Sequence, residues 1–134
     1  MRELRIRTTR RSHVVDISAE VRDAVAGASG SAVLVYVPHT TAGVTINEHA
    51  DPAVARDLEA ALERMVEDGW PWEHIEPEKG EENAPTHVRA ALMGPSVVIP
   101  LRDDSSLALG TWQGIFFCEF DGPRDRSVYV SILS

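Results

Sequence analysis

The sequence has little of several residue types on which common protein chemistries depend. Its one cysteine, Cys118, excludes an internal disulfide. Its one lysine, Lys79, leaves a single candidate for Schiff-base chemistry. Apolar residues fill 43% of the 134 positions, but no apolar run approaches the roughly 18 residues of a membrane-spanning helix. Walker loops, GxGxxG turns, CxxC pairs and HExxH motifs are absent too. The polar turns therefore become the candidate sites.

Positive charge is also scarce. The formal net charge of −8 disfavours nonspecific binding to nucleic acid, because neutralisation of phosphates dominates such binding. Residues 48–82 carry twelve acids against three basic residues, whereas residues 2–11 carry five arginines. We interpret the acidic segment as a solvated helix and loop. The N-terminal residues lack the apolar stretch of a signal peptide, so we expect a cytoplasmic protein without a membrane partner.

The hydrophobic pattern predicts one α+β domain over residues 1–134, with mainly antiparallel sheets. Asp51 and Pro52 are typical of a helix start, and apolar residues at three- and four-residue spacing predict a long helix over residues 52–68. Shorter helices are predicted over residues 18–28 and 86–93. Strands are predicted over residues 4–8, 14–17, 32–37, 44–47, 97–100, 111–120 and 127–133. Most of the strands are joined by tight turns, which favours antiparallel pairing.

The turn from Pro38 to Gly43 joins two apolar strands and contains His39, Thr40 and Thr41. Its backbone N–H groups and hydroxyls could bind an anion, and His39 could transfer a proton near neutral pH. The alternative is a turn whose threonine hydroxyls bond to their own backbone.

The five histidines are His13, His39, His49, His74 and His87. Three of them, His39, His74 and His87, lie in irregular polar segments. His74 lies within a connection over residues 69–86 that contains three prolines, and His87 follows it directly. No two are spaced as a local metal pair, so a divalent-metal site would have to be assembled by the fold. The alternative for each histidine is a solvated or locally satisfied side chain.

Two further segments place polar residues among apolar ones. In the strand over residues 111–120, Thr111, Gln113 and Glu119 share a face with Ile115 and Phe117. Buried polar groups need partners, so these residues either bind a ligand or tie down backbone or an arginine. Asn47 ends the strand over residues 44–47, and Asn83 either caps the helix that follows it or binds substrate.

Long blocks of the sequence resemble the YjbQ-type family, also described as secondary thiamine-phosphate synthases. The resemblance rests on VPHTTAGVTINE with ADP after it, on LMGPS, and on LGTWQGIFFCEFDGPR, which span residues 37–124 in the family's order. The chain departs from the family at His49, where asparagine is usual, and at Glu82 and Ala84–Thr86 around the matching residues Asn83 and His87.

The resemblance implies an antiparallel β-rich homotrimer that joins a hydroxymethylpyrimidine diphosphate to a thiazole phosphate with release of pyrophosphate. Together with the residue patterns, it suggests one pocket with catalytic His39, Asn47, His87 and Glu119, closed by His74. Substrate contacts would come from Thr40, Thr41, Gly43, Asn83, Thr111 and Gln113, and a divalent metal would be held by His39, His74 and His87. The alternatives are a trimer that binds a small molecule or metal without turnover, and a metal-assisted hydrolase.

Overall fold

The computed structural model describes residues 1–76 and 82–134, so Lys79 lies outside the described residues. Within that part, the predicted α+β class is confirmed by seven strands and three helices. No described helix is long and apolar enough to cross a membrane. The elements are β1 (Arg2–Arg7), β2 (His13–Asp16), α1 (Ser18–Val25), β3 (Ala32–Tyr36), β4 (Ala42–Glu48), α2 (Pro52–Met65), α3 (Ala84–Met93), β5 (Ser96–Pro100), β6 (Gln113–Glu119) and β7 (Asp125–Leu133).

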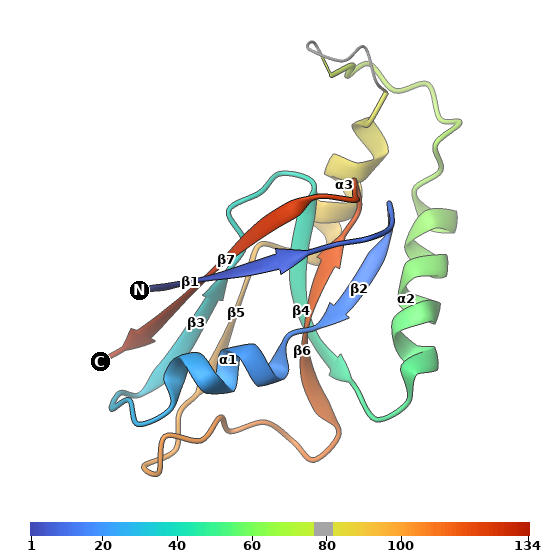
Figure 1. Cartoon of the computed structure of the whole chain (residues 1–134). Coiled ribbons are helices and arrows are strands. Elements are labelled where there is room, and N and C mark those ends of the chain that lie inside the picture. The colour runs from blue at the N-terminus through green and yellow to red at the C-terminus, as the bar shows by residue number, and fades with distance from the viewer. Residues whose placement is uncertain (77–81) are drawn as a thin grey trace.

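The strands of the described residues form two sheets in which neighbouring strands are antiparallel, as the sequence predicts (Figure 1). The four-stranded sheet has the order β1-β7-β3-β5, and the three-stranded sheet has the order β2-β6-β4. In the second sheet Ala42 pairs with Glu119 at one end, and Asn47 pairs with Gly114 near the other. This register places His39 and Asn47 toward opposite ends of the sheet.

The main hydrophobic core lies between the two sheets. Val33 and Val35 of β3 meet Ile115 and Phe117 of β6 there, and α1 adds apolar residues to the same cluster. All four of these side chains are fully buried. The alternation of β6 matches the faces expected from its sequence, because residues 115 and 117 share one face of the strand.

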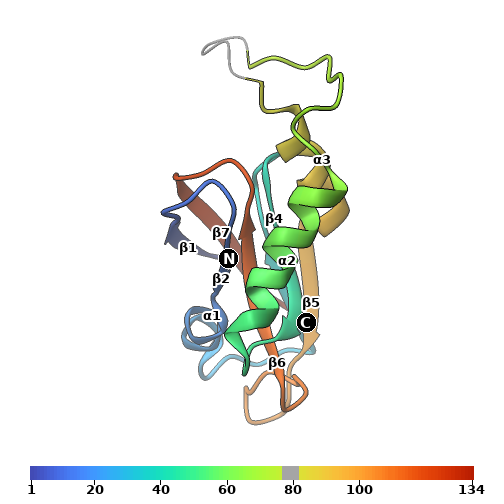
Figure 2. The same cartoon turned by 90° about the vertical axis from the view of Figure 1, so that its right-hand side faces the viewer.

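The other face of β6 is covered by helices (Figure 2). Phe116, Cys118 and Phe120 pack with Leu62 of α2 and Ala90 of α3 in a second cluster. Burial raises the pKa of the Cys118 thiol to about 12, so this cysteine behaves as a small apolar side chain. The long helix therefore packs on a sheet of antiparallel strands, as expected.

Helix α2 begins as predicted and ends three residues earlier. The Asp51 carboxylate accepts a hydrogen bond from the backbone N–H of Ala53 at 2.9 Å, which caps the first turn. At the other end Val66 adopts extended backbone angles. Its carbonyl accepts a hydrogen bond from the buried Arg89 of α3 at 2.7 Å. This bond fixes the end of α2 against α3 and sets where the following loop starts.

Candidate functional site

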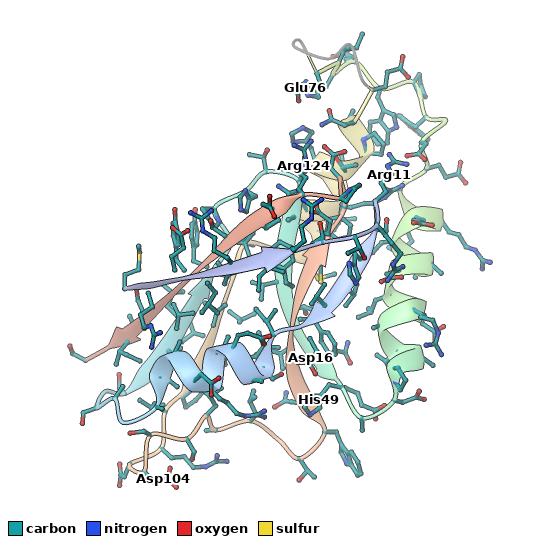
Figure 3. The ribbon with its side chains drawn as sticks, viewed as in Figure 1. Arg11, Asp16, His49, Glu76, Asp104 and Arg124 are labelled. Carbon is teal, nitrogen blue, oxygen red and sulfur yellow. The ribbon has the colours of Figure 1, made fainter. Side chains whose placement is uncertain are left out.

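A cleft of about 640 Å³ opens where the turn after β3, the start of α3 and the turn before β7 meet. This volume is within the range of small-molecule sites. Figure 3 shows Arg124 and Glu76 at this end of the molecule, and Asp16 and His49 at the opposite end. Polar side chains that line the cleft include His39, Thr41, Asn83, His87, Arg124 and Glu76.

Beneath the cleft lies a fully buried carboxylate, that of Glu119. The guanidinium of Arg126 donates to both of its oxygens, one bond measuring 2.8 Å. Thr8 donates its hydroxyl to the same carboxylate at 2.7 Å, and the backbone N–H of Asp121 donates at 3.1 Å. Arg126 lines the cleft, whereas Glu119 does not. Glu119 therefore acts on the cleft through Arg126, which it positions.

Arg126 also holds the turn that carries His39. Its Nη2 donates to the hydroxyl of Thr41 at 2.8 Å. Thr41 is 6% exposed, so this hydroxyl is committed to the structure of the turn. Thr40 is exposed, by contrast, and its hydroxyl stays accessible at the cleft wall.

Asp121 joins the two opposite walls of the cleft. One of its carboxylate oxygens accepts from Asn83 at 3.0 Å and from Arg124 at 2.9 Å. The Oδ1 atom of Asn83 is buried without a partner among the described residues. Because a buried carbonyl oxygen that lacks a hydrogen bond is costly, this atom is a candidate acceptor for a ligand group.

His39 is held in one tautomer. Its Nε2 accepts a hydrogen bond from the backbone N–H of Ser127 at 2.9 Å, so in the neutral ring the proton is on Nδ1. Burial lowers the pKa of His39, and the positive charge of Arg126 lowers it further. The ring is therefore neutral at pH 7. It is suited to donate a hydrogen bond from Nδ1, and its Nε2 is unavailable to a metal.

Two of the three predicted metal ligands, His74 and His87, do lie together. Their ring centroids are 4.8 Å apart with an angle of 88° between the planes. The third member of the group is Glu76, and one ligand atom from each residue lies within 4.8 Å of the other two. His39 lines the same cleft, yet it stands outside this group.

Other predicted site residues lie away from the cleft. Asn47 is exposed and accepts from the backbone N–H of Glu48 at 2.8 Å. It is five residues along β4 from Ala42, or about 16 Å at the usual rise of a strand. Gln113 accepts from the backbone N–H of Gly110 at 2.7 Å, and Thr111 is exposed in the turn before it. Asn47 and Gln113 therefore bond to nearby backbone, and none of the three residues lines the cleft.

Gly43 has a packing role at the edge of the site. A Cβ atom at this position would lie 2.6 Å from the carbonyl oxygen of Gly94 and 3.1 Å from Met93. Val44 donates its backbone N–H to the same carbonyl at 3.1 Å. The glycine lets the end of α3 approach β4, and so it positions the helix that carries His87.

Four polar cleft residues were missed by the sequence reasoning, namely Glu76, Asp121, Arg124 and Arg126. A His-x-Glu spacing from His74 to Glu76 was the available signal for the first, because it occurs in the loop already singled out. Asp121 and Arg124 stand in the block LGTWQGIFFCEFDGPR, which served only to identify the family resemblance. Arg126 carried no signal, since a strand arginine is usually solvated.

Comparisons with known proteins match nearly the whole chain to relatives of one kind. The chain is 42% identical to the UPF0047 protein YugU of Bacillus subtilis, with 99% of this chain and 98% of that protein covered. It is 44% identical to the UPF0047 protein MJ1081 of Methanocaldococcus jannaschii, with 96% and 90% covered.

Solved structures give the same result. The structure of an uncharacterised conserved YjbQ/UPF0047-family protein of Clostridium acetobutylicum superposes with a TM-score of 0.90 at 42% identity, over 99% of this chain and 100% of that chain. The conserved hypothetical protein TT1486 of Thermus thermophilus gives 0.87 at 34% identity, over 99% and 100%. A family model described as "UPF0047 protein YjbQ-like" matches residues 2–134. The chain therefore belongs to the YjbQ-like UPF0047 family.

Proposed function

We propose that the cleft binds phosphorylated small molecules and joins a hydroxymethylpyrimidine diphosphate to a thiazole phosphate, releasing pyrophosphate. The observation that carries the proposal is the set of hydrogen-bond donors on one cleft. They are the Nδ1–H of His39, the guanidinium of Arg124 and the hydroxyl of Thr40. Backbone N–H groups of Thr40 and Thr41 add to them, since neither donates to another described group.

The reaction places its electrostatic demand on the leaving group. The bond from the benzylic-type carbon to the diphosphate oxygen breaks, the thiazole nitrogen forms the new bond, and negative charge collects on the departing oxygens. Donors fixed before the reaction stabilise such charge without reorganising. Arg124 is fixed by Asp121 through its Nε and Nη2 atoms. Its Nη1 makes no hydrogen bond within the described residues, and it can meet a phosphate oxygen.

The test supplies both precursors with a divalent cation and measures pyrophosphate and thiamine phosphate. Under the proposal, pyrophosphate appears only when both precursors are present. Arg124→Gln should lower kcat/KM at least tenfold, because one good charged hydrogen bond contributes about 1.5–3 kcal/mol. Arg7→Gln removes an exposed arginine of β1 and should leave the rate unchanged. Formation of no product from the two precursors would contradict the proposed reaction.

Metal-assisted hydrolysis is the second candidate, and the closeness of His74, Glu76 and His87 favours it. The same assay separates the two functions. A hydrolase releases phosphate or pyrophosphate from a single phosphorylated compound in water, whereas the transferase needs the second substrate. A protein that only binds would show heat on titration with the diphosphate and no product in either reaction.

We also propose a homotrimer, and the exposed face of the four-stranded sheet supports association with further copies. On that face Tyr36 stacks on Tyr129 with ring centroids 6.5 Å apart. Leu34 pairs in register with Val98, which is 56% exposed. Light scattering should give three chain masses for the wild type, and Val98→Asp should dissociate it. A monomer mass for the wild type at micromolar concentration would contradict the trimer.

A further inference from the structure

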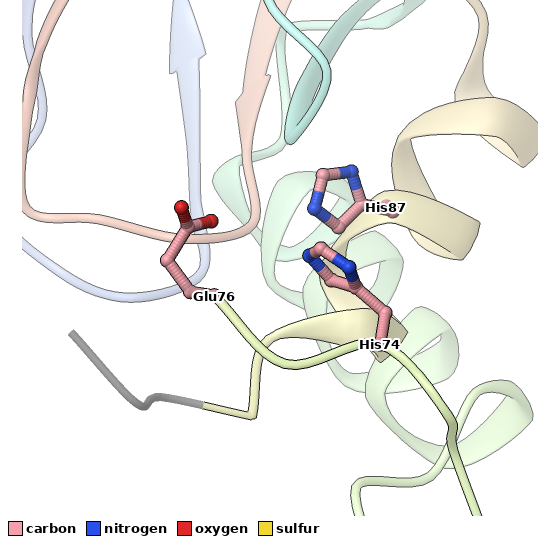
Figure 4. Close-up of side chains that lie close together, drawn as sticks. All are labelled: His74, Glu76 and His87. Atoms are coloured by element: carbon pink, nitrogen blue, oxygen red, sulfur yellow. The ribbon is translucent and has the colours of Figure 1, made fainter. Parts of the chain in front are cut away.

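We propose that His74, Glu76 and His87 bind a divalent transition-metal ion of the zinc type on the wall of the cleft. Figure 4 shows a nitrogen of each imidazole ring turned toward the side on which the Glu76 carboxylate lies. The three ligand atoms lie within 4.8 Å of one another. Two imidazoles and one carboxylate form a common ligand set of catalytic zinc.

The spacing of the three atoms fits a cation after a small adjustment. When three points are no more than 4.8 Å apart, some position lies within about 2.8 Å of all of them. Zinc bonds to histidine nitrogen and carboxylate oxygen measure about 2.0–2.2 Å. Each ligand atom therefore has to move by less than about 1 Å, which rotation about side-chain torsions supplies without any change of backbone.

Within the described part of the chain, the side chains of these three residues have no competing polar partners. Nε2 of His87 is buried and has no hydrogen bond within residues 1–76 and 82–134. No hydrogen bond or ion pair to the side chain of His74 or Glu76 is present in those ranges either. This contrasts with His39, whose Nε2 accepts from Ser127, and with Glu119, whose carboxylate accepts four hydrogen bonds. A metal bond would satisfy the buried nitrogen lone pair of His87.

Two of the ligands lie on segments fixed by other contacts. His87 belongs to α3, whose Arg89 bonds to the carbonyl of Val66. His74 follows a compact turn in which the indole N–H of Trp72 donates to the carbonyl of Glu67 at 2.9 Å. Trp72 and Val88 line an adjoining groove that the two histidines also line, which gives the site an apolar edge.

The ligand chemistry selects the class of cation. Imidazole nitrogens suit zinc, cobalt and nickel, whereas magnesium prefers oxygen ligands and keeps its water. Three protein ligands leave a fourth position, and Glu76 and His87 both line the cleft that contains Arg124. If the proposed function holds, a phosphate oxygen can occupy this position, and the cation offsets the negative charges of Glu76 and Asp121. The metal site itself does not depend on that function.

The test titrates the full chain with Co²⁺ in the absence of any substrate and records visible absorption and tryptophan fluorescence. One equivalent should bind, with the absorption of a four- or five-coordinate nitrogen and oxygen site, and Zn²⁺ should displace it. Glu76→Gln and His87→Ala should each weaken Co²⁺ binding at least tenfold. Millimolar Mg²⁺ should not compete.

Matched variants separate this site from nonspecific binding. Glu73→Gln changes an exposed carboxylate of the same loop. His13→Ala removes a histidine of β2 that belongs neither to the cleft lining nor to the proposed ligand group and that accepts a hydrogen bond from Thr9. The Glu73→Gln and His13→Ala variants should bind Co²⁺ with the affinity of the wild type. Because His87→Ala touches a packed helix, circular dichroism checks its fold, and the loop variant Glu76→Gln gives an independent result. Binding of less than one equivalent, unchanged affinity in Glu76→Gln, or displacement by Mg²⁺ would overturn the proposal, whatever the synthase assay shows.

Discussion

A histidine and an asparagine lie near each end of the three-stranded sheet, His39 and Asn83 at the cleft and His49 and Asn47 at the opposite end. At the far end the polar side chains have partners within the protein. His49 pairs with Asp16 at 3.0 Å, and Asp16 also accepts from Ser18. At the cleft, buried polar atoms of Asn83 and His87 stay without partners among the described residues.

The difference between the ends shows how residues of one type acquire different roles. A polar side chain beside a free backbone N–H satisfies itself, as Asn47 does with Glu48. At the cleft, long-range partners take up some groups and orient others, as Glu119 does for Arg126. The oriented polar groups that still lack a hydrogen-bond partner line the cleft, and this makes the cleft the candidate site.

The largest expected effect is at the buried ion pair under the cleft. Glu119→Gln leaves the Arg126 guanidinium, only 5% exposed, without a counter-charge. Removal of one partner of a buried pair typically costs about 3–5 kcal/mol in the free energy of unfolding. Asp125→Asn, which breaks an exposed pair with Arg7, should cost less than about 1 kcal/mol. Urea unfolding measures both, and equal costs would contradict the role given to Glu119.

Two glycines, one near each end, test whether close packing is rigid. Gly43→Ala drives a methyl group against the backbone carbonyl of Gly94, and should cost about 1–3 kcal/mol in stability. Gly114→Ala meets the ring of His49 at 2.5 Å and its Cβ atom at 2.7 Å. Because the backbone fixes a Cβ atom, rotation of the side chain cannot remove this contact, and we expect a cost of about 1–3 kcal/mol here too. Gly69→Ala serves as the control, because a Cβ atom there meets open space. If Gly43→Ala changes the free energy of unfolding no more than Gly69→Ala does, α3 can shift to make room and the packing is not rigid.

The histidine at the cleft should make stability depend on pH. Burial lowers the folded-state pKa of His39, so the unfolded chain takes up a proton first as pH falls. Its contribution is complete above the unfolded pKa of about 6.5 and is lost as pH falls from there toward the folded pKa. His39→Gln should flatten the fall in unfolding free energy between pH 7.5 and 5.5. An identical slope in wild type and variant would show that the ring is free to protonate.

The smallest effects are expected at the far end. Asn47→Ala and Gln113→Ala each remove one exposed side chain that bonds to local backbone. Each should change stability by less than about 1 kcal/mol and leave ligand binding at the cleft unchanged. Asn83→Ala, by contrast, should weaken binding of the diphosphate in the same calorimetric titration. A tenfold loss of affinity for the diphosphate in Asn47→Ala would show that Asn47 does contribute to the binding site.

The secondary structure was largely predictable because it depends on local pattern. Alternation predicted the faces of β6, and the Asp51 cap with Pro52 predicted where α2 begins. The end of α2 was placed three residues late, since the bond from Arg89 to Val66 is made by a residue far along the chain. The family was also predictable, because its motifs are continuous in the sequence.

The candidate site was predictable only in part. His39, Thr40, Asn83 and His87 were named from their turns, and all line the cleft. Asn47, Thr111 and Gln113 were named on the same kind of signal, yet the register of β4 with β6 carries them to the other end.

The sequence by itself determined the class of fold, the cap that starts α2 and the buried faces of the strands, since these depend on residues within one or two turns of each other. The tertiary structure alone decided which polar residues share a space. It paired Glu119 with Arg126, fixed the tautomer of His39 through Ser127, and placed Glu76 beside two histidines. The physical reason is that hydrogen bonds between distant segments depend on strand register and helix packing, which local periodicity does not contain.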